Sequence, residues 1–226
     1  LPVVYSGGTY TVMQHPACTL DTLGTYRMTV IVESTEDNNR SNDTLRNTFT
    51  VYTPMSGDYT VDNNHSTTDG NYHSITAAVD DLIKRGATGA VRFLLIDTLY
   101  DNETFPITIT PWYGMSASNN LIIKDSIPGG RINGGTFTNF WIQDADYVTF
   151  DGVRMNGYGN ITFLDGATYN TVKNCELTSK VYVNGAPFYE SILFWECFNG
   201  NPSGNSYNLI ENNTFNNIAV ETEYPN

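Results

Sequence analysis

Six charged side chains in the second half of the chain could do chemistry together. They are four carboxylates and two bases: Asp144, Asp146, Asp151, Asp165, Arg154 and Lys173. Carboxylates that converge beside an Arg or Lys can cleave polysaccharides, either through bound Ca²⁺ or through acid–base catalysis. The segment that holds these residues contains no Asp-Asp pair, no Gly-His-Gly and no Arg-x-Lys, the short motifs that we would expect of such enzymes. We therefore predict no catalytic residues, and a polysaccharide lyase or glycoside hydrolase is the alternative.

Metal binding is the second chemistry to consider. The polar loop around residues 34–44 could bind Ca²⁺ through Glu36, Asp37 and Asp43, although a plain hairpin loop explains the same residues. Residues 62–70 begin like an EF-hand loop but lack the Gly at the sixth position and the distal Glu. The three histidines are isolated and are interpreted as surface or turn residues: His15, His65 and His73. We predict no cofactor and no metal ligands, with Ca²⁺ as the one candidate ion.

The cysteines give no disulfide framework. Cys18, Cys175 and Cys197 are an odd number at wide spacing, and no C-x-x-C motif occurs. In the repeat described below Cys175 shares its position with Val153, which favours a buried thiol that acts as a small apolar residue. Cys197 follows 22 residues later, so a disulfide between Cys175 and Cys197 stays open.

Composition excludes two classes of partner. The 226 residues carry a formal net charge of −13, and such a surface repels nucleic acid and anionic lipid. No apolar run approaches the ~18–20 residues of a membrane-spanning helix, so we expect no membrane insertion. Polarity comes mainly from Asn, Thr, Ser, Gly and Tyr, which is typical of turn-rich β proteins outside the cell. The chain begins at Leu1 without a basic leader, and we expect a piece of a longer, processed polypeptide.

Alternation of apolar and polar residues predicts the elements of the first third. Residues 24–33 and 47–53 alternate as strands around a polar loop, which indicates the last hairpin of a β-sandwich whose earlier strands are absent. A boundary follows near residues 53–59. A helix is predicted over residues 74–86, with Ser74 as its N-cap and Gly86 as its stop. Its apolar face consists of Ile75, Ala78, Val79, Leu82 and Ile83.

A repeat of about 22 residues organises the second half. Residues 147–157, 169–179 and 207–217 align, and the polar insertion at residues 198–206 explains the longer last interval. Residues 141–146 align with residues 163–168 in the same frame. A short period with strand-like segments predicts a solenoid, in which equivalent residues stack about 4.8 Å apart. Two apolar columns follow, one of Phe150, Val172 and Ile210 and one of Met155, Leu177 and Phe215.

Two polar columns lie between the apolar ones. Gly152, Asn174 and Asn212 share one position, and Gly and Asn interchange where the backbone needs a positive φ, so we predict a sharp corner there. The preceding position holds Asp151, Lys173 and Glu211, which would form an exposed charge ladder of alternating sign.

These columns predict an all-β fold: a right-handed parallel β-helix with an N-terminal capping α-helix, preceded by the end of an Ig-like β-sandwich. The predicted domains are residues 1–53 for the β-sandwich, residues 54–118 for the opening of the β-helix, and residues 119–226 for its coils. The cap is assigned to Ile75, Val79, Leu82 and Ile83, because an open solenoid end exposes apolar core and unpaired strand edges.

Several motifs resemble β-helix domains in large exported surface proteins of Bacteroidota. The matching positions are Ser56, Gly57, Tyr59, Thr60, Val61, Leu82, Gly86, Gly89, Tyr100, Glu103, Asn120, Leu121 and Ile122. Residues 23–44 are similar to the end of the small adhesion-type β-sandwich domains often found upstream. The resemblance implies a parallel β-helix, a type IX secretion context and an extracellular, cell-surface location. It also implies O-glycosylation at D-[ST]-apolar tripeptides, whose acceptors here are Thr22, Thr44, Thr98 and Ser126, with the loop position of Thr44 favoured.

The sequence favours a structural or adhesive function over an enzymatic one. We expect a non-catalytic segment of a large secreted cell-surface protein that acts as a stalk or adhesin. A glycan, a surface protein, the secretion machinery or other chains of a surface assembly are the expected partners. The aromatic side chains could form a sugar-stacking platform, and packing in the core is the alternative. A third hypothesis sees the chain only as cargo of a type IX secretion machine.

Overall fold

A computed structural model describes residues 22–31, 39–68, 70–183, 191–195 and 204–221. Within these ranges the chain is mostly β, with one α-helix and one short 3₁₀ helix. It divides into two compact units, Leu1–Thr53 and Pro54–Asn226, and the division falls at the boundary proposed from the sequence. Each unit is described by itself.

The first unit contains an antiparallel hairpin. Strand β1 (Gly24–Ile31) pairs with β2 (Thr44–Val51) in continuous register, and a 3₁₀ turn η1 (Arg40–Asn42) precedes β2. Tyr26 and Phe49, which are partners across the pair, stack with ring centroids 5.9 Å apart. Large apolar side chains on both strands stay exposed, among them Val30 at 43% and Leu45 at 64%. The second strand begins three residues earlier than predicted, because Asp43 already ends the 3₁₀ turn as its C-cap.

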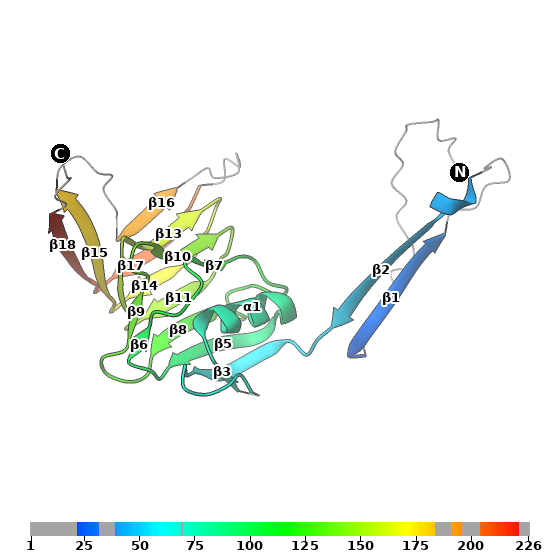
Figure 1. Cartoon of the computed structure of the whole chain (residues 1–226), viewed down its shortest axis with the longest axis horizontal. Coiled ribbons are helices and arrows are strands. Elements are labelled where there is room, and N and C mark those ends of the chain that lie inside the picture. Colours follow the sequence, from blue (N-terminus) through cyan, green and yellow to red (C-terminus); the bar gives the residue numbers. More distant parts are fainter. Residues whose placement is uncertain (1–21, 32–38, 69, 184–190, 196–203, 222–226) are drawn as a thin grey trace. The chain divides into compact units, whose positions relative to one another are not determined.

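The second unit is built from three parallel sheets (Figure 1). The seven-stranded sheet has the order β17-β14-β11-β8-β5-β3-β4, with bounds β17 Leu209–Glu211, β14 Thr171–Lys173, β11 Val148–Asp151, β8 Leu121–Asp125, β5 Ala87–Leu95, β3 Met55–Val61 and β4 Asn71–Tyr72. The five-stranded sheet has the order β18-β15-β12-β9-β6, with bounds β18 Thr214–Glu221, β15 Glu176–Val183, β12 Arg154–Gly157, β9 Arg131–Asn133 and β6 Leu99–Tyr100. The four-stranded sheet has the order β16-β13-β10-β7, with bounds β16 Ile192–Trp195, β13 Gly159–Leu164, β10 Thr138–Gln143 and β7 Ile107–Ile109.

From β5 onward the chain visits the three sheets in a fixed order. It runs through the seven-stranded, the five-stranded and then the four-stranded sheet, and repeats this circuit as β5-β6-β7, β8-β9-β10, β11-β12-β13 and β14-β15-β16, before β17 and β18 begin it again. We call each circuit a coil. Consecutive coils therefore place equivalent strands side by side in parallel pairs. This all-β arrangement of parallel sheets is compatible with a parallel β-helix.

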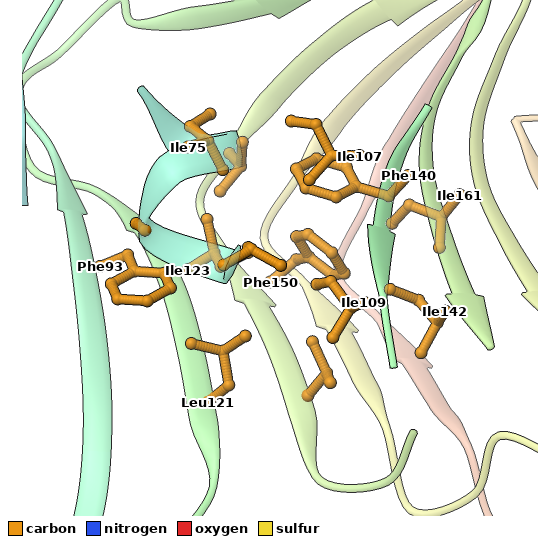
Figure 2. Close-up of a cluster of buried hydrophobic side chains, with 14 of the residues drawn as sticks. Ile75, Phe93, Ile107, Ile109, Leu121, Ile123, Phe140, Ile142, Phe150 and Ile161 are labelled. Carbon is orange, nitrogen blue, oxygen red and sulfur yellow. The ribbon is translucent and has the colours of Figure 1, made fainter. Parts of the chain in front are cut away.

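The core lies inside the coils and consists of in-register apolar columns. Phe93, Ile123 and Phe150 are direct neighbours across β5, β8 and β11, and the column continues to Val172 and Ile210. A second column in the five-stranded sheet runs through Tyr100, Ile132, Met155, Leu177 and Phe215. The four-stranded sheet contributes Ile107, Phe140 and Ile161 from its own strands (Figure 2). Both apolar columns that the sequence proposed are thus present as neighbouring strand positions.

The helix α1 (Ile75–Arg85) covers the first coil. It contacts β3, β4, β5 and β7, and it follows β4 and precedes β5 in the chain (Figure 1). Ile75, Val79 and Leu82 are buried, and Ala78 is buried with them, whereas Ile83 is only partly buried. The helix is one residue shorter at each end than the predicted span, because Ser74 and Gly86 are its caps.

Two side chains fix the start of α1, and a glycine ends it. The side chain of Ser74 accepts from the amide of Ala77 at 3.0 Å, while the carboxylate of Glu103 accepts from the amides of Ile75 and Thr76, each at 2.8 Å. A carboxylate at this end also complements the helix dipole. Gly86 has φ 72°, and a Cβ there would lie 2.6 Å from a backbone oxygen of Tyr113, so only glycine fits.

Two features differ from the sequence-based expectation. Strand β3 occupies residues for which the sequence predicts a domain boundary, and it extends the seven-stranded sheet beyond the first coil. The alignment of residues 141–146 with residues 163–168 is wrong by one position at its start, since Trp141 pairs with Thr162 and not with Phe163. Gly166 is an extra residue in the following turn, and it restores the frame so that Ala145 and Ala167 are both fully buried.

The predicted corner residues lie at the turn between the seven-stranded and five-stranded sheets. Gly152 follows β11, Asn174 follows β14 and Asn212 follows β17, and their φ values are 72°, 56° and 54°. Asn174 also donates from Nδ2 to Oδ1 of Asp151 in the preceding coil at 2.9 Å. The Gly/Asn interchange predicted a positive φ, and the structure has one at each of the three positions.

Candidate functional site

Three of the four candidate carboxylates join neighbouring coils, and the four do not converge on one point. Oδ1 of Asp146 accepts from the amide and the hydroxyl of Thr168, both at 2.7 Å, in the next coil. Oδ2 of Asp165 accepts from Nε2 of Gln143 at 2.9 Å. Asp144 is exposed and has a positive φ of 54°, as a turn residue after β10. Each carboxylate therefore lies in its own structural setting.

Asp151 lies in a charge ladder that is longer than the sequence suggested. Its Oδ2 is 3.8 Å from Nζ of Lys173 on one side and 4.0 Å from Nζ of Lys124 on the other. Register extends the column from Lys124 through Asp151 and Lys173 to Glu211, with the sign alternating at every step. Opposite charges that face each other across strands stabilise the pairing modestly, and like charges would oppose it.

A groove forms where one coil has a longer loop than the coils after it. Between the seven-stranded and five-stranded sheets the later coils turn in two residues, at 152–153, 174–175 and 212–213. The coil of β8 and β9 needs five residues, 126–130, for the same turn. The long loop lies beside the short turns of the following coils and forms one side of a hollow that these turns also line. We call the resulting hollow the corner groove.

The corner groove has a volume of about 510 Å³ and adjoins a smaller hollow of about 270 Å³. Gly129, Arg154 and Glu176 line both, so the two hollows lie side by side. The larger is lined by Asp125, Ser126, Ile127, Pro128, Gly129, Gly152, Arg154, Asn174, Cys175, Glu176, Asn212 and Thr214. The smaller adds Arg131, Met155, Asn156 and Thr178. Hydroxyl, amide and charged groups dominate this lining.

Two arginines lie next to each other in the groove. Arg131 and Arg154 are direct partners across β9 and β12, and Glu176 is the partner of Arg154 on the other side. Nε of Arg154 is 3.4 Å from Oε2 of Glu176, and both side chains are about half exposed. The guanidinium of Arg131 has no ion-pair partner among the residues that the structure describes, and its other strand neighbour is the uncharged Leu99.

The loop holds Asp125 at the edge of the groove. Partial burial raises the pKa of Asp125, and this shift is opposed by hydrogen bonds from the amides of Ile127 and Gly130 and by the positive charge of Arg154. The amide of Ile127 donates to Oδ1 at 3.2 Å. Gly129 has φ 103°, and its missing side chain leaves the backbone open toward Nη1 of Arg154. The loop conformation therefore brings Asp125 and Arg154 to the same hollow.

Cys175, which lines the corner groove, is a buried thiol. Its thiol is buried and free, and Sγ donates to the backbone oxygen of Lys173 at 3.2 Å. Burial raises the pKa of the thiol to about 11, so little thiolate exists near neutral pH. Cys197, its proposed partner in a disulfide, lies outside the described residues, as does Cys18.

Three tyrosines, of which Tyr169 and Tyr207 are exposed, form a separate feature on the corner before β11, β14 and β17. Tyr147, Tyr169 and Tyr207 each have a positive φ, between 56° and 59°. Their rings stack in register, 5.4 Å apart for the first pair and 4.9 Å for the second. Because the ring faces cover one another, the faces within the stack cannot hold a sugar ring. The stack is thus better explained as packing between coils than as a sugar platform.

The remaining proposed residues are spread over the surface. Thr22, Thr98 and Ser126 are exposed, whereas Thr44 is the first residue of β2 and is partly covered, so the preference for Thr44 as a loop residue is wrong. Among the Ca²⁺ candidates, Glu36 and Asp37 lie outside the described residues, and Asp43 ends the 3₁₀ turn. No group of three or more His, Cys, Asp or Glu in the described ranges could hold a metal ion.

The sequence contained a signal for the groove that the 22-residue comparison missed. Residues 131–134 read R-I-N-G and residues 154–157 read R-M-N-G, which marks Arg131 and Arg154 as equivalent positions. The two stretches are 23 residues apart, so a fixed period of 22 residues does not align them. Asp125 and Glu176 carry no motif, and only the register brings them to the same side as the arginines.

Comparison of the chain with protein-family models, with curated proteins and with solved structures finds no match. Within the part of the chain that the structure describes, no helix combines the length and the apolar character that crossing a membrane requires. The function is therefore inferred from the geometry of the corner groove and of the stacked columns.

Proposed function

We propose that this chain is a non-catalytic segment of a large secreted cell-surface protein and acts as a stiff stalk or adhesin. In this proposal the second unit is a right-handed parallel β-helix capped by α1, and the first unit is the end of an Ig-like β-sandwich. The extracellular location, the type IX secretion context and O-glycosylation at Thr22, Thr44, Thr98 and Ser126 belong to the same proposal. They are supported by the resemblance and by the composition.

One observation carries the proposal: the candidate acids are used to hold coils together. Asp146 and Asp165 accept hydrogen bonds from neighbouring coils, and Asp151 lies between two lysines. An acid or base catalyst needs a proton-transfer group free to reach a substrate, with a pKa near the working pH. Carboxylates that are fixed in contacts between coils make the stack of coils rigid. Rigidity over many coils is what a stalk requires.

A screen of the purified chain against polysaccharides tests the proposal. Pectin, alginate and neutral glycans are incubated with the chain, with and without Ca²⁺, and reducing ends and unsaturated sugar are measured. We expect neither product above the level of a heat-denatured control. Product that depends on the folded chain would refute the proposal.

A polysaccharide lyase or hydrolase is the second candidate, and the corner groove is the observation that favours it. Asp125 and Glu176 line the same hollow as Arg154, which gives two carboxylates and a base in one place. Glu176 forms an ion pair with Arg154 and also accepts a hydrogen bond from Nδ2 of Asn216 at 3.1 Å. Its carboxylate is therefore held in place and is not free to act as an acid or base. Under the enzymatic alternative, Asp125→Asn and Glu176→Gln would abolish any product found in the screen.

A further inference from the structure

We propose that the corner groove binds a short oligosaccharide that carries carboxylate groups, and that Arg131 and Arg154 hold the carboxylate. This inference rests on the proposed function, because it names the ligand class of the adhesive face. It is carried by the pairing of two like charges in a groove whose other lining groups are mostly polar.

The two charged columns of the structure differ in the order of their positive and negative charges. In the column of Lys124, Asp151 and Lys173 the sign alternates at every step, which is the arrangement that stabilises strand pairing. In the neighbouring column Arg131 and Arg154 are direct partners of the same sign, and only Arg154 has an acid beyond it. A sheet that needed only solubility and register would not place two guanidiniums opposite each other.

An anion in the groove would remove this repulsion. A guanidinium binds a carboxylate through two parallel N–H bonds, and two adjacent guanidiniums can share one carboxylate between them. Glu176 already compensates Arg154 at 3.4 Å, so the uncompensated positive charge is that of Arg131. The anion is thus expected at the end of the groove that Arg131 lines, which is the smaller hollow.

The uncharged lining favours a sugar over other anionic ligands. Along the groove lie the hydroxyls and amides of Ser126, Asn174, Asn212, Thr214, Asn156 and Thr178. These groups both donate and accept hydrogen bonds, as sugar hydroxyls do. From Arg131 to Thr214 the groove crosses three steps between neighbouring strands, each of about 4.8 Å. That is room for an extended chain of hydroxylated rings.

The overall charge of the chain limits the length of the ligand. The net charge of −13 repels a long polyanion, while screening over ~8 Å at physiological salt confines the attraction of the arginines to their surroundings. A short or sparsely charged oligosaccharide gains the local attraction without the long-range repulsion. We therefore expect an oligomer with few carboxylates to bind better, per carboxylate, than a dense polyuronate.

Isothermal titration of the whole chain with galacturonic acid trisaccharide tests the proposal, with neutral galactose trisaccharide as the matched probe. The variants are Arg131→Gln and Arg154→Gln. The control is Arg92→Gln, which removes a half-exposed arginine that pairs with Asp58 on the seven-stranded sheet, outside the groove. Circular dichroism establishes that each variant is folded.

We expect the acidic trisaccharide to bind about tenfold or more tightly than the neutral one, and each groove variant to lose about tenfold or more, as for the loss of a charge-assisted hydrogen bond. Arg92→Gln should bind as the unchanged chain does. Equal binding of the two sugars, unchanged binding by Arg131→Gln, equal loss in Arg92→Gln, or no binding at all would each overturn the inference. Cleavage of the trisaccharide during the titration would instead refute the non-catalytic function.

Discussion

Replacing Asn170 by Ala should be among the most damaging single changes in the second unit. Oδ1 of Asn170 accepts from the amide of Val148 at 2.8 Å, and Nδ2 donates to the backbone oxygen of Ala145 at 3.1 Å. Asn170, Val148 and Ala145 are all buried. The change leaves one buried donor and one buried acceptor without a partner, at ~1–3 kcal/mol each, so we expect a loss of about 3–5 kcal/mol in the free energy of unfolding.

Asn208 provides the matched comparison one coil further on. Its Oδ1 accepts from the amide of Asn170 at 2.8 Å and its Nδ2 donates to the backbone oxygen of Ala167 at 3.0 Å, so it makes the same two bonds. Asn208 is partly exposed, and water can replace its side chain. We expect Asn208→Ala to lose only about 1–2 kcal/mol.

Urea unfolding followed by tryptophan fluorescence measures both losses. All three tryptophans, Trp112, Trp141 and Trp195, lie in the second unit, so the signal reports on that unit. The slope of the transition should stay constant if only stability changes. A loss below about 1 kcal/mol for Asn170→Ala, or an equal or larger loss for Asn208→Ala, would refute the argument that buried side-chain bonds between coils hold the stack together.

Further changes test the cap, the corner, the thiol and the groove. Leu82→Asp places a carboxylate at a fully buried helix position and should cost at least ~4 kcal/mol and cause aggregation, which light scattering detects; a soluble variant of equal stability would contradict the cap. Asn174→Ala should cost ~1–2 kcal/mol in urea unfolding, because φ is 56° there, while Asn174→Gly should be near neutral; equal effects would count against the corner. Burial raises the pKa of Cys175 to about 11, above that of an unfolded thiol, so this contribution to stability is complete below ~8.5 and is lost as the pH rises toward 11. In a variant with Cys18→Ser and Cys197→Ser, reaction of the Cys175 thiol with a maleimide at pH 8 should require unfolding, and fast labelling of this folded variant would contradict it. The pKa of Asp125 is raised, so acidification should neutralise Asp125 before an ordinary Asp and strengthen binding of the acidic trisaccharide, until the sugar itself is protonated; Asp125→Asn should remove this pH dependence, and its persistence would exclude Asp125 as the cause.

The repeat predicts the structure well where the backbone conformation favours only a few residue types. The interchange of Gly152 with Asn174 and Asn212 shows a backbone position that needs a positive φ, and the columns beside it follow from the same frame. Prediction fails where the number of residues in a turn changes. One extra residue, Gly166, shifts the pairing of the preceding strand, because an insertion leaves no trace in a fixed period.

The corner groove could not be predicted from the sequence for a related reason. It exists because residues 126–130 form a longer turn than their equivalents, and its charges come from four strands of three different coils, β8, β9, β12 and β15. Arg131 and Arg154 are 23 residues apart, one more than the 22-residue period, so the period does not align them. The role of Glu103 at the start of α1 was likewise hidden, since the two are joined only after the first coil closes.

Proton NMR of the galacturonic acid trisaccharide, mixed with the whole chain and Ca²⁺ and followed over a day, tests the central claim most directly. The same spectra report binding, through broadening of the sugar signals, and chemistry, through new signals from unsaturated or shortened products. A binding segment without catalytic activity predicts broadened signals that Arg131→Gln sharpens, and no new signals at any time. Product signals that disappear in Glu176→Gln would contradict the account and identify the groove as an active site.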